Sequence, residues 1–259
     1  MRRVQATAAI AALIVITSGC CGAVGAQEAK PDAASTAASR TTALDPPMRR
    51  PTITFAFARE GFGVPVPKYT MIIRDDGTGS YEGEALPPPT RYGPAAASAA
   101  APFRRDVRIT PATAGRIFKL AGQLNHFNKT CASKAKNVAD TGTKTLTYAG
   151  ADGSGSCTYN YTENKELQTL TEVFEGITET LDQGRELERL HRYDRLGLDS
   201  AMSYLSDEVA AGRALEVGTI EATLRAIAED ADVMARVRAK ANALLSQIAM
   251  AAARDTATR

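Results

Sequence analysis

The sequence has no tryptophan, and aromatic residues make up 6% of its 259 residues. A chain so poor in aromatic side chains lacks the stacking platforms on which proteins bind sugar rings or nucleic-acid bases. The formal net charge is +2, and Arg2 and Arg3 supply two of the positive charges. The rest of the chain is therefore near neutral, which argues against a nucleic-acid partner and against an anionic membrane surface.

Recognisable catalytic motifs are also missing. The sequence contains no G-x-S-x-G, no P-loop and no G-x-G-x-x-G that leads from a strand into a helix. Its only two histidines, His126 and His191, are too few to complete a metal site with the cysteines. We therefore expect no cofactor and no metal. If the chain is an enzyme, its best catalytic candidates are His191, Asp194 and Glu188 in the polar run 185–195, which also fits a solvated helix face.

The single long apolar run, residues 8–16, follows Arg2 and Arg3 and precedes a stretch of small residues. This order is typical of a secretory signal peptide, and the run is shorter than the ~20 residues that span a bilayer. We expect cleavage after Ala26, so residues 1–26 would be the signal and the protein would be periplasmic or extracellular. Lipoprotein processing at Cys20 is the alternative, although Thr17 stands where that signal prefers an aliphatic residue.

Export changes how the four cysteines are interpreted. Cys20 and Cys21 belong to the signal region, which leaves Cys131 and Cys157 as one pair. An even pair in an oxidising compartment predicts a disulfide, and closing a loop of this length stabilises a fold by roughly 3–4 kcal/mol in the chain-entropy model. A redox pair or a metal pair is the weaker interpretation, because redox cysteines usually lie close together in sequence.

The pattern of the central region predicts an α+β fold. Residues 27–50 are rich in Ala, Ser, Thr and Pro and read as a disordered linker, and the α+β domain spans 51–182. Strands are expected at 52–58, 68–74, 80–83 and 103–109, with an inserted surface loop at 85–102. Thr110 and Pro111 open a helix, a hairpin of strands 143–148 and 157–161 follows, and a helix covers 165–182. The prediction is a small antiparallel sheet with helices on one face.

The C-terminal region is predicted to be helical throughout. Residues 183–252 contain about four short amphipathic helices with brief loops, and residues 253–259 read as a disordered tail. A helix boundary is expected at Gly184, with the next helix over 185–196. These helices would form a small bundle or would pack on the open face of the sheet.

The layout of residues 52–182 resembles a family of short exported bacterial domains of unknown function. That family has an opening strand, a connection that ends in Pro-x-Tyr, an Asp-Gly hairpin, a helix, a second hairpin and a closing helix. The residues that carry the likeness here are Gly63, Pro67, Tyr69, Asp76, Gly77 and Tyr81. The family usually has cysteines near the connection, whereas this chain has Phe62-Gly63-Val64-Pro65. The resemblance implies the fold and no activity.

Together these observations favour a non-catalytic binding or structural module of the cell envelope, with an envelope protein as its partner. An extracytoplasmic hydrolase with an unrecognised site and an envelope component anchored by a lipid at Cys20 are the two alternatives.

Overall fold

The computed structural model describes residues 50–59, 65–86 and 100–257. The predicted signal peptide, Cys20, the linker up to residue 49 and most of the insertion at 85–102 lie outside the described residues.

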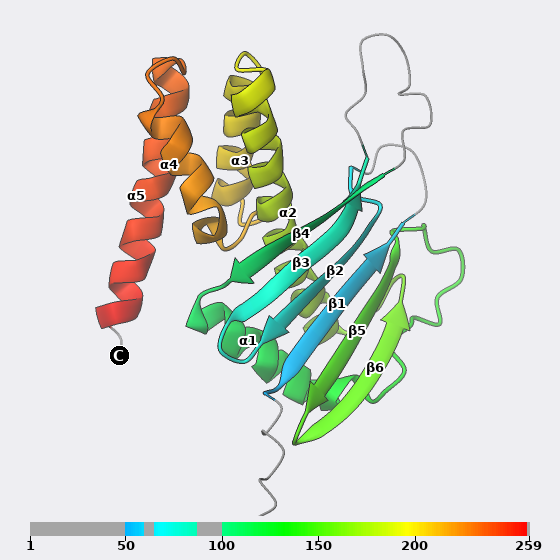
Figure 1. Cartoon of the computed structure of the whole chain (residues 1–259). Helices are drawn as coiled ribbons and strands as arrows, with labels where there is room; N and C mark the ends of the chain where they lie inside the picture. Colours follow the sequence, from blue (N-terminus) through cyan, green and yellow to red (C-terminus); the bar gives the residue numbers. More distant parts are fainter. Residues whose placement is uncertain (1–49, 60–64, 87–99, 258–259) are drawn as a thin grey trace, which may run out of the picture. The chain divides into compact units, whose positions relative to one another are not determined.

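A six-stranded antiparallel sheet forms the first part of the fold, in the order β4-β3-β2-β1-β5-β6 (Figure 1). This confirms the predicted α+β class. The predicted strands at 52–58 and 68–74 appear with those bounds. The strands are β1 Thr52–Ala58, β2 Lys68–Arg74, β3 Thr78–Ala85, β4 Ala101–Arg108, β5 Thr143–Gly150 and β6 Gly153–Tyr159. β4 begins inside the stretch predicted as an inserted loop.

One face of the sheet is buried because apolar side chains alternate with polar ones along the strands. Ile53, Phe55, Met71 and Leu146 on this face are fully buried. The helices α1 Pro111–Gln123 and α2 Lys165–Tyr193 lie behind the sheet in Figure 1 and cover this face. Ile117 of α1 and Phe174 of α2 belong to the same apolar core. We refer to this side as the covered face and to the other as the open face.

The helix α1 begins as predicted. The side chain of Thr110 accepts a hydrogen bond from the N–H of Thr113, and Pro111 occupies the first turn, where its missing N–H costs nothing. After Leu124 the chain forms η1, Asn125–Phe127, a short turn in which all three residues have positive φ. Left-handed backbone costs about 1–2 kcal/mol per L-residue, so tertiary contacts must hold this turn in place.

The second hairpin is longer than its composition suggests. The Gly, Asp and Ser residues of 149–156 favour turns and predict a loop, but β5 and β6 are joined by a turn at 151–152 only. Gly153 and Gly155 belong to the strand, and their lack of a side chain leaves room for η1 to pack closely against it. A Cβ on Gly155 would lie 2.3 Å from the carbonyl oxygen of His126, and a Cβ on Gly153 would lie 2.9 Å from the His126 ring. Composition therefore reflects tertiary packing here rather than a turn.

The predicted helix boundary at Gly184 is wrong, because α2 continues unbroken for 29 residues to Tyr193. Gly184 lies against Ile220, and a Cβ there would come within 2.4 Å of the Ile220 Cγ2. The glycine makes room for a neighbouring element and does not end the helix. Two apolar cores meet along α2, the first reaching Leu181 and the second beginning at Leu187.

The C-terminal helices build this second core. They are α3 Leu198–Ala210, η2 Val217–Ile220, α4 Glu221–Glu229 and α5 Ala235–Ala257. Met202, Leu224 and Val237 are fully buried among them and against the end of α2. Of the two predicted arrangements, the bundle is the one observed. α5 also runs through most of the predicted tail, up to Ala257.

Candidate functional site: a trough on the open sheet face

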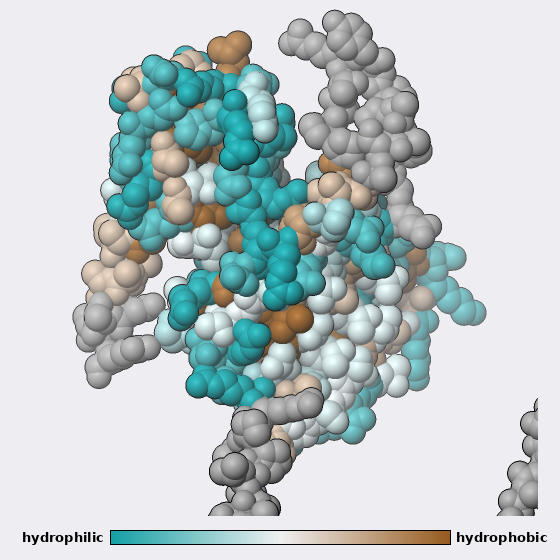
Figure 2. All heavy atoms as spheres, viewed as in Figure 1, coloured by the Kyte–Doolittle hydropathy of each residue, from teal (hydrophilic) through white to brown (hydrophobic). Residues whose placement is uncertain are grey.

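The open face of the sheet is rich in small hydroxyl side chains. Strand alternation places Thr52, Thr54, Thr70, Thr145 and Thr147 there, next to the alanines of β1. Across the β5–β6 pair, the hydroxyls of Thr145 and Thr158 lie 2.9 Å apart and those of Thr147 and Ser156 lie 3.0 Å apart. The surface over the sheet is mostly pale and teal, with few hydrophobic patches (Figure 2). No aromatic side chain of the described strands belongs to this face, so a ligand there would not stack on an aromatic ring of the sheet.

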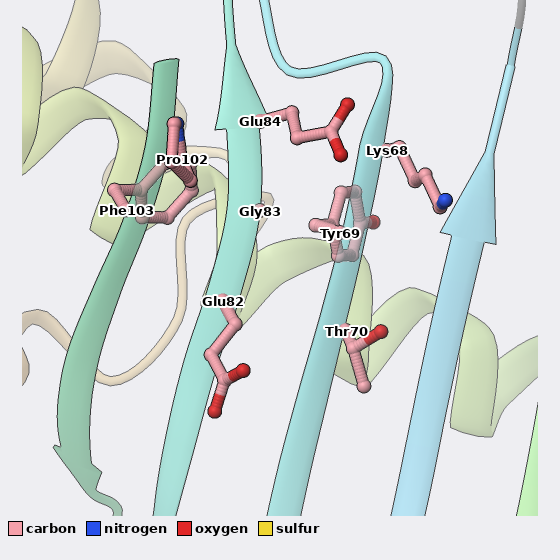
Figure 3. A pocket seen from close by; sticks show the side chains of 8 residues that line it. All are labelled: Lys68, Tyr69, Thr70, Glu82, Gly83, Glu84, Pro102 and Phe103. Atoms are coloured by element: carbon pink, nitrogen blue, oxygen red, sulfur yellow. The ribbon is translucent and has the colours of Figure 1, made fainter. Parts of the chain in front are cut away.

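Two open pockets join on this face to form what we call the trough. The larger has a volume of about 250 Å³ and is lined on the open face by Lys68, Thr70, Glu82, Glu84 and Pro102 (Figure 3). The smaller has a volume of about 110 Å³ and shares Lys68 and Thr70 with the first. It continues over the small side chains of Ala56 and Ala58 to Thr143 and Thr145. The trough therefore crosses five strands, from β4 to β5.

Opposite charges face each other in the trough. Lys68 of β2 is the direct cross-strand neighbour of Glu84 of β3, and both side chains are drawn on the same side of the sheet in Figure 3. Neither side chain has a hydrogen bond or ion pair with another described residue. Glu82, by contrast, is paired with Arg104. Lys68 and Glu84 can thus offer an ammonium donor and a carboxylate acceptor to a ligand.

A row of aromatic rings makes the floor of the trough rigid from behind. On the covered face, Phe57 stacks on Tyr69 at 5.0 Å between ring centroids, and Tyr69 contacts Tyr81 at 5.5 Å. Tyr81 in turn meets Phe103 at 5.1 Å, and the Arg185 guanidinium lies 3.9 Å from the Phe103 ring. Packed rings of this kind hold the neighbouring strands in one arrangement.

Tyr81 connects this row to α2. Its hydroxyl donates to the Asp182 carboxylate, with both oxygen distances at 3.0 Å, and Arg185 lies 3.0 Å from the same carboxylate. Burial raises the pKa of Asp182 to about 6, although Arg185 and Tyr81 stabilise its charged form. Burial also raises the pKa of Tyr81 far above its usual value, so its hydroxyl stays protonated and remains a donor.

Behind the other end of the trough lies a buried lysine that the sequence pattern does not reveal. Lys144 is 5% exposed on the covered face of β5. Its ammonium donates to the carbonyl oxygens of Thr141 at 3.3 Å and Gly142 at 3.4 Å, and Glu175 lies 3.8 Å away. Burial lowers the pKa of Lys144, and Glu175 opposes the shift. These contacts tie the start of β5 to the preceding loop, which is a positioning role for this part of the trough.

The structure does not join the three predicted catalytic residues into one site. Glu188 binds Arg105 of β4 and accepts a hydrogen bond from Thr223 of α4 at 2.8 Å. Burial would raise the pKa of Glu188, but Arg105 and Thr223 together lower it. Asp194 is exposed at the end of α2, where its N–H donates to the Leu190 carbonyl.

His191 has a different carboxylate partner from those expected. Its Nε2 lies 2.8 Å from Asp230 Oδ2, and Arg195 lies 3.0 Å from the same oxygen. The hydrogen bond from His191 and the charge of Arg195 contribute to lowering the pKa of Asp230. This cluster ties the end of α2 to the connection between α4 and α5, and none of its contacts among the described residues involves a nucleophilic hydroxyl or thiol.

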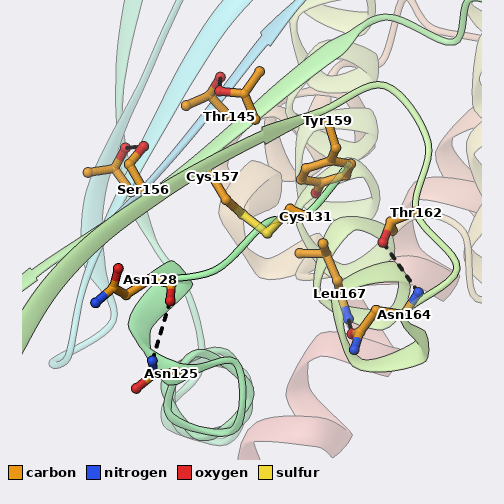
Figure 4. Close-up of a disulfide and its surroundings, with 12 residues drawn as sticks. Asn125, Asn128, Cys131, Thr145, Ser156, Cys157, Tyr159, Thr162, Asn164 and Leu167 are labelled. Atoms are coloured by element: carbon orange, nitrogen blue, oxygen red, sulfur yellow. Dashed lines mark hydrogen bonds between the residues drawn. A yellow bond between two sulfur atoms is a disulfide. The ribbon is translucent and has the colours of Figure 1, made fainter. Parts of the chain in front are cut away.

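The predicted disulfide between Cys131 and Cys157 is present, with its Cα atoms 5.7 Å apart. It joins the segment after η1 to β6 on the covered face (Figure 4). Beside it, the His126 ring stacks on Tyr148 at 4.2 Å, and the Tyr148 hydroxyl donates to Asp152 at 2.6 Å. Burial and the Asp152 carboxylate raise the pKa of Tyr148 to about 12. The disulfide and the ring stack hold the left-handed turn of η1 against the sheet.

Within the described ranges, no group of three or more His, Cys, Asp or Glu residues is arranged to hold a metal ion. None of the described helices is long and apolar enough to span a bilayer. No family model matches the chain, and no curated protein matches it either.

Proposed function

We propose that this chain is an exported binding protein of the cell envelope, and that it holds an extended, polar peptide segment of an envelope protein in the trough. The observation that carries the proposal is the trough itself, which is lined by hydroxyl groups and equipped with the opposite charges of Lys68 and Glu84. The described strands place no aromatic side chain on the open face, which disfavours a glycan, because sugars bind through stacking as well as hydrogen bonds.

A peptide suits the dimensions and chemistry of this surface. The trough crosses the strands and offers carboxylate groups at one end, the Lys68 ammonium near its middle and threonine hydroxyls at the other end. Peptide N–H and C=O groups need partners of this kind when they leave water. A segment with one acidic and one basic side chain would complement Lys68 and Glu84. The likeness to exported domains and the disulfide support the assignment to the envelope.

The test compares capture from envelope extract by the wild-type protein with capture by two matched variants. Ala56→Arg fills the trough floor, because Ala56 is flanked by Thr70 and Thr145 in the sheet. Ala149→Arg makes the same change at the exposed far end of β5 on the same face. We expect a partner that is retained by the wild type and by Ala149→Arg and reduced at least tenfold by Ala56→Arg. If the two arginine variants retain the same proteins equally well, the trough is not the binding site.

Charge reversal at the trough then tests the chemistry of the partner. The double variant Lys68→Glu/Glu84→Lys keeps the cross-strand pair but exchanges its positions. A peptide aligned by these charges should bind the double variant at least tenfold more weakly, at unchanged thermal stability. Equal affinity would show that the two charges do not orient the partner.

The export part of the proposal is tested separately at the N-terminus. Mass spectrometry of the exported protein should show a chain that begins at Gln27. A lipid-modified chain that begins at Cys20 would instead identify the anchored form, with the same binding face. The hydrolase alternative gains no support from the positions of His191, Glu188 and Asp194.

A further inference from the structure

The two edge strands of the sheet differ in the features that prevent pairing with another strand. β4 carries a proline and four charged residues, which are the usual devices that protect an edge, namely Pro102, Arg104, Arg105, Asp106 and Arg108. β6, with the sequence GSGSCTY, has no charge and no proline. Because β4 is protected and β6 is not, β6 is the edge that is available to a partner strand.

The outer side of β6 presents backbone groups that can pair with a further strand. The turn at 151–152 makes Gly150 and Gly153 a hydrogen-bonded pair, so by alternation Ser154, Ser156 and Thr158 direct their N–H and C=O groups away from β5. No described residue forms a backbone hydrogen bond with these three from that side. Strand alternation places their side chains on the open face, and Figure 4 shows Ser156 on the side opposite the disulfide.

We propose that two copies of this chain associate by pairing their β6 strands antiparallel about Ser156, which joins the two sheets into one. A two-fold axis at Ser156 places Ser156 opposite itself and Ser154 opposite Thr158 of the second copy. On the covered side it places Gly155 opposite Cys157 and Gly153 opposite Tyr159. Every pair is neutral, and in each copy η1 packs on the covered side of Gly153 and Gly155.

The hydroxyl pairs in this register repeat a contact that the fold already makes. Within one chain, Ser156 and Thr158 form hydroxyl–hydroxyl hydrogen bonds with Thr147 and Thr145 of β5. Cross-strand hydroxyl pairs of this type contribute to the stability of a sheet. A second copy extends the same hydroxyl row, whereas an unrelated peptide would match it only by chance. Because the contact is isologous, it closes at two copies.

The disulfide and the η1 segment also restrict the conformation of β6. The disulfide fixes Cys157 from the covered side, and the η1 backbone lies against Gly155, where a Cβ would come within 2.8 Å of the Asn128 nitrogen. A strand that is held this way has little freedom to lose when a partner binds, which favours association. The proposal does not depend on the trough and can fail separately from it.

The first test is sedimentation of the purified protein over a range of concentrations. We expect a concentration-dependent dimer. Ser156→Lys places two like charges opposite each other at the axis and should weaken the dimer at least tenfold, while Asp106→Lys, the matched change on β4, should leave it unchanged. A wild-type protein that stays monomeric at the highest concentration overturns the proposal, and so does a dimer that Ser156→Lys leaves intact.

Cysteine cross-linking tests the register and remains informative if Ser156→Lys does not fold. Directly opposed residues lie close enough for a disulfide, at about 5.5 Å between Cα atoms in a hydrogen-bonded pair. Ser156→Cys should therefore cross-link with itself above the wild-type background. Ser154→Cys and Thr158→Cys should cross-link mainly when the two variants are mixed. Equal self-linking of Thr158→Cys and Ser156→Cys would rule out pairing about Ser156.

Discussion

Two ionisable residues, Lys144 and Asp182, have tertiary partners that no local sequence pattern indicates. Lys144 occupies the buried phase of β5, and carbonyl oxygens of the preceding loop surround its ammonium. Asp182 lies beside the buried stripe of α2, next to Leu181, and accepts a hydrogen bond from the hydroxyl of Tyr81, which is 101 residues away in sequence. No local pattern reveals such a partner, so the sequence does not predict these residues as parts of a site.

The raised pKa of Asp182 predicts a specific pH dependence of stability. The pKa is about 6 in the folded protein against an ordinary value of 3.8, so the folded state holds more protons between these values. The protonated Asp182 carboxyl contributes its full stabilisation below pH 3.8, and this contribution is lost as the pH rises through about 6. For a shift of this size, the free energy of unfolding falls by roughly 3 kcal/mol. Asp182→Asn cannot ionise, so its stability relative to the wild type should increase between about pH 4 and pH 7.5. Denaturant unfolding at both pH values measures this.

Tyr81→Phe provides the internal check on that assignment. The Tyr81 hydroxyl stabilises the Asp182 carboxylate, so its removal should raise the pKa of Asp182 further. The pH range in which stability is lost should then move upward, and the dependence on pH should remain. Parallel unfolding free energies for the wild type and Asp182→Asn over the whole range would contradict a perturbed carboxyl at this position.

At the level of elements, glycines inside helices have opposite roles that sequence alone cannot separate. Gly184 in α2 and Gly115 in α1 both occupy helix interiors. A Cβ at Gly115 would meet nothing within 4 Å, whereas a Cβ at Gly184 would collide with Ile220. The predicted break at Gly184 rests on the low helix propensity of glycine, and close packing against η2 overrides that propensity.

Alanine substitution at the two glycines should therefore shift stability in opposite directions. Gly115→Ala should stabilise the protein by about 0.5–1 kcal/mol, because alanine lowers the entropy of the unfolded chain and fits the open site. Gly184→Ala should destabilise it by about 1–3 kcal/mol through overpacking. Thermal melts of the two variants and the wild type decide this. A stabilising effect at both positions would mean that Ile220 moves aside without cost.

At the level of the whole molecule, the disulfide restrains the unfolded chain between Cys131 and Cys157, a separation of 26 residues. The chain-entropy model gives roughly 3–4 kcal/mol for such a loop, which corresponds to about 6–16 °C in Tm for a protein of this size. Cys131→Ala/Cys157→Ala should melt lower by this amount, and reduction of the wild type should reproduce most of the decrease. An unchanged Tm under oxidising conditions would show that the two cysteines are not bonded in the protein.

Local sequence determined much of this fold. Alternation located β1 and β2 at their observed bounds, the Thr110–Pro111 pair located the start of α1, and the parity of the cysteines gave the disulfide. These features depend on neighbours within a few residues or on a simple count, so they can be read from one sequence. The segments outside the described residues, including the predicted signal peptide, remain predictions.

Only the tertiary structure decided which face of the sheet is open, where the trough lies and which edge is unprotected. Thr70, Ala58 and Thr143 come from different strands, and strand order alone places them side by side. Strand order in a sheet results from the total burial of all six strands and both covering helices, which no single segment encodes. Gly153 and Gly155 are turn formers in sequence, but they belong to a strand. The η1 segment that packs against them is about 27 residues away, so local sequence does not show this contact.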